Sequence, residues 1–467
     1  MNSKLILAAV IAASAAARAD QLDLNKLPGK QQLRFASPSG KSEACIRSNT
    51  FPGAKLQGDG YEDDDAKKEA KLCLYDFYKQ TTTDPKIANV AVCPKVFSTN
   101  PGLEFHEMPD GTQKAAYEAS ECKKAKGRAG DKVAKFKSSI SCSYTPSILA
   151  YYHLGRLLDI GHVPQAVVRT MDVAEHLKRS TEALGYVKHL YPPTGQLLGQ
   201  IWSSFIGADK APKAAHSFLA LYTADAQQVV GALITNPGGE EFYAELNGST
   251  KGDRVANFQL TNTFKILSSK APLLKQNLPK TLAGSAQTML RLKDAGDLIL
   301  LDTILSQADR FGNLHEQPAY VWMEGDKLEH KKAKSEDPAK MPPELKAKNA
   351  VIVKQMLMKD NDCGVTKENK LKNAHVLEKV AHLSPKTYQK LLWVSSQWSK
   401  PEVQSWLHTE LLFTKADAAL IGGNLAAAVA TLKKGCAAGT LFLDVDLKEH
   451  LGKGLPAATK DRCELQP

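Results

Sequence analysis

The stretch that decides the fold runs from residue 145 to residue 172 and reads TPSILAYYHLGRLLDIGHVPQAVVRTMD. Thr145 is a residue type that caps helices, Pro146 suits the first helical position, and the apolar residues after them recur at helical spacing. Gly161 ends this helix, and the apolar, β-branched residues 163–168 predict a strand. A helix therefore leads directly into a strand.

The residues before this helix are predicted to be mainly extended. Residues 91–139 have strand character, with turn sequences at 108–111 (MPDG), expected to join two strands, and at 126–130 (KGRAG). The glycines of the second turn suit either a phosphate loop or a plain hairpin turn, and we favour the hairpin turn. The strand that follows, VAKFK at 133–137, has both of its lysines on one face.

The N-terminus has the pattern of a secretory signal over residues 1–19. Lys4 supplies positive charge, residues 5–16 are apolar but too short to span a bilayer, and Ala-Arg-Ala at 17–19 fits a cleavage site. We expect a mature chain that starts at Asp20 and is exported. The short signal looks bacterial, which indicates the periplasm or the exterior of the cell.

The second half of the chain is mainly helical. Residues 297–306 predict a buried apolar helix, which leads into the loop QADRFGN at 307–313. Strands are predicted at 319–323 and 350–358. The charged stretch between them, residues 326–349, predicts a solvated loop.

These elements predict an α+β chain with two lobes, a small β-rich N-lobe and a mainly helical C-lobe. After the signal, residues 20–90 are expected to form an N-terminal arm, irregular over its polar first part. Residues 91–236 form the predicted N-lobe, with a helical insertion after residue 172. The break NPGG at 236–239 separates it from the predicted C-lobe, residues 237–467.

The cysteines and the net charge limit the classes of protein to which this chain can belong. The eight cysteines are even in number and none forms C-x-x-C, so in an exported chain they predict disulfides of open connectivity. The net charge of +11 falls to +9 without the signal, which holds two basic residues and no acid. Because lysines and acids are interleaved, with no basic stripe of stacking aromatics, we expect no nucleic-acid partner. No later segment predicts a membrane span.

Three residues occur in the order that phosphoryl transfer requires. Lys137 lies on a strand before the helix, Asp309 in the loop after the buried helix, and Asp360 after the last strand. In kinases a lysine neutralises nucleotide phosphates, one aspartate orients the acceptor hydroxyl, and another holds Mg²⁺. No G-x-S-x-G, H-E-x-x-H or Walker A pattern supports a hydrolase.

Four segments resemble the secretory-pathway kinase family that includes the Golgi casein kinase, the xylose kinase and four-jointed. Together they fall within about residues 130–440. They are the helix–strand stretch 147–172, the strand before the hinge at 228–233, the D-R catalytic motif at Asp309-Arg310, and the D-N-G metal motif at Asp360-Asn361.

The resemblance implies an atypical protein-kinase-like fold that uses ATP with Mg²⁺ or Mn²⁺. It implies that Lys137 contacts the phosphates, that Asp309 is catalytic and that Asp360 is a metal ligand. Asn313 would be a second metal ligand or a nucleotide contact. The acceptor would be a protein Ser/Thr or a sugar hydroxyl.

The sequence departs from this family at one important position. The family's glutamate on the helix after the lysine strand falls near Ser147-Ile148, and neither side chain can replace it. Either another acid substitutes and the chain is an exported kinase, or it is a pseudokinase that serves as a binding or scaffold module.

Each candidate residue also has a plainer interpretation. Asp309-Arg310 is alternatively a local ion pair, residues 360–362 a polar turn, and Lys137 an exposed strand lysine with Lys135 as a register alternative. Cys363 is interpreted as a disulfide or buried cysteine. Asn247-Gly248-Ser249 is a glycosylation sequon, to be used only if the host glycosylates.

Overall fold

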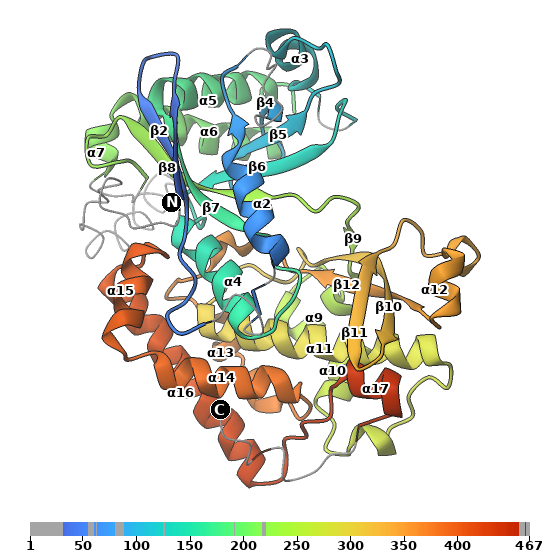
Figure 1. Ribbon diagram of the computed structural model, residues 1–467. Helices are drawn as coiled ribbons and strands as arrows, with labels where there is room; N and C mark the ends of the chain where they lie inside the picture. Colours follow the sequence, from blue (N-terminus) through green and yellow to red (C-terminus); the bar gives the residue numbers. More distant parts are fainter. Residues whose placement is uncertain are drawn as a thin grey trace.

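The computed structural model describes most of the chain after its first 30 residues (Figure 1). The described ranges are 31–54, 60–61, 63–79, 88–124, 127–190, 192–216, 221–456 and residue 463. The predicted signal, residues 1–19, and the expected mature start at Asp20 lie outside these ranges.

An eight-stranded sheet forms the N-lobe, which we define as residues 31–235. All neighbouring strands are antiparallel except β3 and β4. In spatial order the strands are β1 (Gln31–Ala36), β2 (Ser42–Arg47), β7 (Ala166–Asp172), β8 (Gln228–Thr235), β6 (Lys132–Ser138), β5 (Leu103–Glu107), β4 (Ala88–Pro94) and β3 (Tyr75–Asp76).

The centre of this sheet is buried on both faces. Every residue of β7 is buried, as expected for a strand covered on both sides. On β8, a Cβ at Gly231 would lie 2.5 Å from the ring of Phe136 on the neighbouring strand β6, so only glycine fits. Trp202 and Phe205 pack on one face of the sheet, and the helix that begins at Thr145 packs on the other.

Helices cover the two faces of the sheet in separate layers (Figure 1). One layer holds α5 (Val173–Val187) and α6 (Thr194–Lys210), and α4 (Thr145–Leu157) lies between the sheet and the C-lobe. The remaining N-lobe helices are α2 (Asp63–Cys73), α3 (Lys114–Glu121) and α7 (Pro212–His216).

The C-lobe, residues 241–456 and 463, is built around the long buried helix α11 (Leu282–Leu305). A small sheet packs on α11 and consists of β9 (Glu241–Phe242), β10 (His315–Glu324), β11 (Lys327–Lys332) and β12 (Val351–Leu357). The other helices are α8 (Ala244–Asn247), α9 (Arg254–Gln259), α10 (Asn262–Leu267), α12 (Pro343–Ala347), α13 (Lys370–Asn373), α14 (Pro385–Gln397), α15 (Pro401–Thr409), α16 (Lys415–Ala437) and α17 (Leu447–Lys453), with 3₁₀ turns η3 (Leu273–Lys275), η4 (Pro338–Lys340), η5 (Asn361–Cys363) and η6 (Leu377–Lys379).

The predicted two-lobed α+β architecture is confirmed, but three local predictions are wrong. Residues 31–47, expected to be irregular, form the hairpin β1–β2 because β2 pairs with the sheet strand β7. The turn at 108–111 leads into helix α3, not a strand. The charged stretch 326–349 contains β11, which pairs along β10, and the short helix α12.

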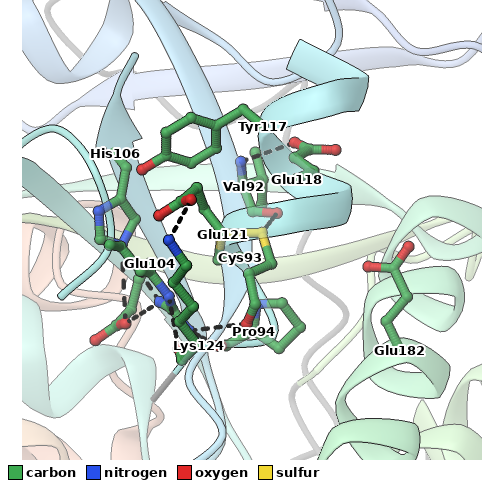
Figure 2. Close-up of a disulfide and its surroundings, with 12 residues drawn as sticks. Val92, Cys93, Pro94, Glu104, His106, Tyr117, Glu118, Glu121, Lys124 and Glu182 are labelled. Carbon is green, nitrogen blue, oxygen red and sulfur yellow. Dashed lines mark hydrogen bonds and ion pairs between the residues drawn. A yellow bond between two sulfur atoms is a disulfide. The ribbon is translucent and has the colours of Figure 1, made fainter. Parts of the chain in front are cut away.

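Four disulfides confirm the expected bonding of the cysteines. They are Cys45–Cys73, Cys93–Cys122, Cys142–Cys363 and Cys436–Cys463. Figure 2 shows the second of them between β4 and α3, where the Val92 amide also donates to Glu118 (2.9 Å). Within the ranges that the structure describes, none of the helices has the length and hydrophobicity to cross a bilayer.

A buried acid on α11 predicts a stability that depends on pH. Burial raises the pKa of Asp294 to about 7, against the hydrogen bond from the Met356 amide (3.0 Å) that lowers it. The stabilisation of the protonated folded state is therefore complete below pH about 4 and lost as pH rises through about 7. Relative to Asp294→Asn, the wild-type unfolding free energy should fall by up to about 4 kcal/mol over this window.

Urea unfolding of both proteins between these pH values measures that difference. Asp326→Asn, in the exposed turn between β10 and β11, is the control and should show no such trend. A constant difference between wild type and Asp294→Asn would contradict the raised pKa.

Candidate active site

Lys137 on β6 is the centre of a buried ion cluster. Its Nζ lies 2.7 Å from Asp362 Oδ2 and 3.6 Å from Asp360 Oδ1. The lysine side chain is only 4% exposed, so the alternative of an exposed strand lysine is wrong. Burial alone would lower the pKa of Lys137, but the two carboxylates outweigh it and raise that pKa above its ordinary value. Lys137 is therefore held charged beside Asp360.

Asp360 lies at the end of β12 in a conformation that few residues adopt. Its φ is +53°, in the left-handed region, and its side chain is 28% exposed. Burial would raise its pKa, but Lys137, Lys95 and Lys135 together hold the pKa of Asp360 well below its usual range. A strained, ionised carboxylate that faces a cleft is typical of a functional position.

Arg310 joins the loop after α11 to the segment after β12. Its buried guanidinium donates to both carboxylate oxygens of Asp302 (2.8 and 3.0 Å), to the Lys359 carbonyl and to Asn361 Oδ1 (2.8 Å). Asp309 beside it is about half exposed and lies 3.5 Å from Arg254. The alternative of a local ion pair between Asp309 and Arg310 is wrong, because each has its own partner elsewhere.

Asn247 fixes the loop that carries Asp309. Its buried side chain donates to the carbonyls of Tyr243 and Leu314 and accepts from the amides of Gly312 and Leu314. A glycan on this amide would replace one of its two N–H donors at a buried position. In the folded protein Asn247 therefore has a structural role.

Replacing Asn247 should loosen this loop. Asn247→Ala leaves buried backbone groups without partners, and we expect it to lower the free energy of unfolding by about 2–3 kcal/mol. Chemical denaturation measures the loss. The exposed sequon residue Ser249→Ala is the matched control, and equal stability of the two variants would contradict the role given to Asn247.

Asn313 is not joined to Asp360 by any described contact. Its amide lies 3.4 Å from the Asp309 carbonyl, within the same loop. Among the residues that the structure describes, no group of three or more His, Cys, Asp or Glu side chains could hold a metal ion. A divalent ion at Asp360 would take its other oxygen ligands from water or a bound phosphate.

The position of the absent helix acid is filled by a serine with a different task. Ser147 Oγ donates to the Asn361 carbonyl (2.6 Å) and accepts from the Gly364 amide (3.1 Å). Its neighbour Ile148 lines the cleft. The ion-pair partner of Lys137 is instead Asp362, two residues after Asp360.

The hairpin loop 95–102 between β4 and β5 lies beside Lys137. A Cβ at Gly102 would be 2.6 Å from the Phe136 carbonyl oxygen and 3.3 Å from Lys137 Cγ. Asn100 contacts both sulfurs of the Cys142–Cys363 disulfide, at 3.3 and 3.2 Å. Residues 127–130 lead from helix α3 into β6, with Gly127 and Gly130 at positive φ, so the favoured interpretation of a hairpin turn between two strands is wrong. The candidate phosphate loop is therefore the segment 95–102, which sequence reasoning missed.

The cleft at Lys137 is nearly closed. It holds about 30 Å³ between Lys135, Lys137, the Asp360–Asp362 segment and the linker residues Asn236 and Pro237. A larger cavity of about 640 Å³ lies behind the linker, against α11 and β10. Because a small ligand needs a few hundred Å³, a nucleotide at Lys137 requires the lobes to move apart.

Comparison with known proteins gives a likeness of fold. No family model and no curated protein matches the chain. A crystal structure of the Golgi casein kinase is similar with a TM-score of 0.41 and 12% identity, over 98% of this chain and 92% of that one. A second, with Mn/ADP bound, has a TM-score of 0.40 and 12% identity, over 97% and 91%.

Proposed function

We propose that this chain is an exported atypical kinase that transfers the γ-phosphate of ATP to a protein Ser/Thr or a sugar hydroxyl, with Mg²⁺ or Mn²⁺. The observation that carries the proposal is the cluster of Lys137, Asp360 and Asp362, which Arg310 connects to the Asp309 loop. A lysine, a metal-binding acid and a loop aspartate are the parts that phosphoryl transfer uses.

Each residue has a defined part in this reaction. Lys137 neutralises phosphate oxygens, and Asp360 holds the divalent ion through a hard carboxylate oxygen. A bound divalent ion would neutralise charge on the phosphates. Asp309, half exposed on its loop, orients the acceptor hydroxyl and accepts its proton. Asn313, on the same loop, is available as a further oxygen ligand once nucleotide binds.

Nucleotide binding requires two changes in the cleft. The lobes separate to enlarge the present space of about 30 Å³. Phosphate oxygens then replace part of the ion-pair contacts that Lys137 makes with the carboxylates of Asp360 and Asp362. The four disulfides support an oxidising compartment such as the periplasm or the exterior of the cell, where ATP would come from outside the protein's own cytoplasm.

A second candidate function is that of a pseudokinase that binds a partner protein without phosphate transfer. The observation that favours it is the pairing of Lys137 with Asp362 in a closed cleft, with Ser147 where the family has an acid. In this alternative the ion cluster holds the lobes together and the cleft stays shut.

Calorimetric titration of the oxidised, signal-free chain with ATP separates these functions. With Mg²⁺ and then Mn²⁺ we expect binding that Asp360→Ala abolishes and that Asp326→Ala, in an exposed turn, leaves intact. Absence of binding with both ions would overturn the kinase proposal and favour the pseudokinase. Binding without transfer to any protein or glycan acceptor would favour a nucleotide-binding pseudokinase.

A further inference from the structure

Four lysines surround the Asp360 carboxylate, and they differ in their partners. Lys137 is paired with Asp362 and Asp360, and Lys359 is paired with Glu240. Lys95 and Lys135 make no ion pair with any carboxylate that the structure describes. These four lysines face three acids, Asp360, Asp362 and Glu240, so the site has one more lysine than it has acids.

The two unpaired lysines approach the cleft from different elements. Lys135 lies on β6, two residues before Lys137 and on the same face, and it lines the cleft itself. The nearest cross-strand acid, Glu104, is paired with Arg128 (2.7 Å) and Lys132 (3.4 Å) instead. Lys135 is therefore left facing the cleft with other lysines as its neighbours.

Lys95 comes from the hairpin that lies beside Lys137. Its amide donates to the Gly102 carbonyl (2.8 Å), which closes the base of the loop 95–102. Asn100 holds the same loop against the Cys142–Cys363 disulfide. A Cβ added to Gly102 would lie 3.3 Å from Lys137 Cγ, so the base of this loop, where Lys95 bonds Gly102, is beside the ion cluster.

The closeness of these lysines lowers the pKa values of Lys135 and Lys95. Burial and then the charges of Lys359 and Lys95 lower the pKa of Lys135 to about 7, and burial and Lys137 lower the pKa of Lys95. The charge of Asp360 raises both pKa values, but it does not offset these effects in full. Lysines in excess of their acids repel one another, and perturbed charges of this kind cluster at functional sites, where a ligand of opposite charge relieves the repulsion. A phosphate chain is the anion that suits several ammonium groups at once.

We propose that Lys95 and Lys135 bind the phosphate chain directly, so that this site selects a polyphosphate over a nucleoside monophosphate. The inference rests on the proposed function in assuming that the ligand is a nucleotide, but the lysine cluster itself requires only a chain of phosphates. Lys137 then contacts phosphate oxygens beside the divalent ion on Asp360, while Lys95 and Lys135 bind the other phosphate oxygens.

Calorimetry with sodium tripolyphosphate, ATP and AMP tests the proposal on the oxidised chain and its Lys95→Gln and Lys135→Gln variants. We expect each variant to bind tripolyphosphate and ATP about tenfold more weakly than wild type does, and to bind AMP with nearly the wild-type affinity. Lys178→Gln, on the exposed face of α5 in the same lobe, is the control and should bind like wild type.

Thermal unfolding without ligand supplies a second readout. Each Lys→Gln change removes a repelled charge, so both variants should melt at or above the wild-type temperature while they lose affinity. Lower affinity accompanied by lower melting temperatures would indicate damaged structure and overturn the assignment.

The outcomes separate this inference from the proposed function. ATP binding that both variants retain in full overturns the lysine assignment and leaves the kinase proposal standing. Tripolyphosphate binding that the variants lose, in a protein that binds no ATP, supports the lysine assignment and rejects the nucleotide. If the wild-type protein binds neither tripolyphosphate nor ATP, both the lysine assignment and the kinase proposal are overturned.

Discussion

Asp309→Asn is expected to reduce phosphate transfer by about a thousandfold while ATP affinity stays close to that of wild type. Asp309 is about half exposed on a loop whose backbone is fixed by Asn247, and its carboxylate, 3.5 Å from Arg254, is accessible to an acceptor hydroxyl. Loss of a residue that accepts a proton in the transition state costs about 10²–10⁴ in rate. Single-turnover transfer and calorimetric ATP binding, measured on the same preparation, give the two quantities.

The control for this prediction is Asp253→Asn. Asp253 caps α9 next to Arg254, close to the same surface, but its carboxylate accepts from the amides of Val255 and Ala256. It should affect stability slightly and transfer hardly at all. Transfer that survives in Asp309→Asn would remove this residue from the catalytic role and redirect attention to the other acids of the cleft.

Arg310→Met is expected to lower the free energy of unfolding by about 3–5 kcal/mol. Among the described residues, the change leaves the buried carboxylate of Asp302 with the Tyr151 hydroxyl (2.6 Å) as its one remaining side-chain donor. It also removes the donors to the Lys359 carbonyl and Asn361. An uncompensated buried charge is among the costliest defects in a folded protein. Urea denaturation followed by circular dichroism measures the loss.

A second substitution distinguishes the lost ion pair from lost packing. Adding Asp302→Leu to Arg310→Met removes the stranded carboxylate, and a large part of the lost stability should return. If the double variant were less stable than Arg310→Met alone, the energetic role given to the buried pair would be wrong. ATP binding should suffer in both variants, because Arg310 also positions Asn361 next to Asp360.

Local patterns predicted the elements that local chemistry determines. Helix α4 begins at Thr145 with Pro146 in its first turn, as predicted, although the N-cap is Tyr144 and not Thr145, and the buried helix before Asp309 is the C-terminal part of α11. The strand that carries Lys137 and the two lobes were also predicted correctly. In each case apolar periodicity and turn residues within about a dozen positions decide the outcome.

The elements and contacts that the sequence did not predict depend on pairing between residues far apart in the chain. Residues 31–47 are polar, and they form strands because a sheet edge more than a hundred residues away pairs with them. β11 is charged because one of its faces meets solvent while its backbone pairs with β10. Lys95 and Asp362 meet Lys137 only after three separate segments fold together. None of these partners is visible in the local spacing of residues.

The Cys142–Cys363 disulfide limits how the two lobes can separate. Cys142 belongs to the segment after β6, and Cys363 follows the acids of the C-lobe, so this bond and the linker at 236–240 are two separate covalent connections between the lobes. A rigid body held at two points keeps a single rotational freedom, about the line through both points. The nucleotide cleft would therefore open like a door about one fixed axis, with little twist or sliding, and cleavage of that one bond would change the direction of opening as well as its ease.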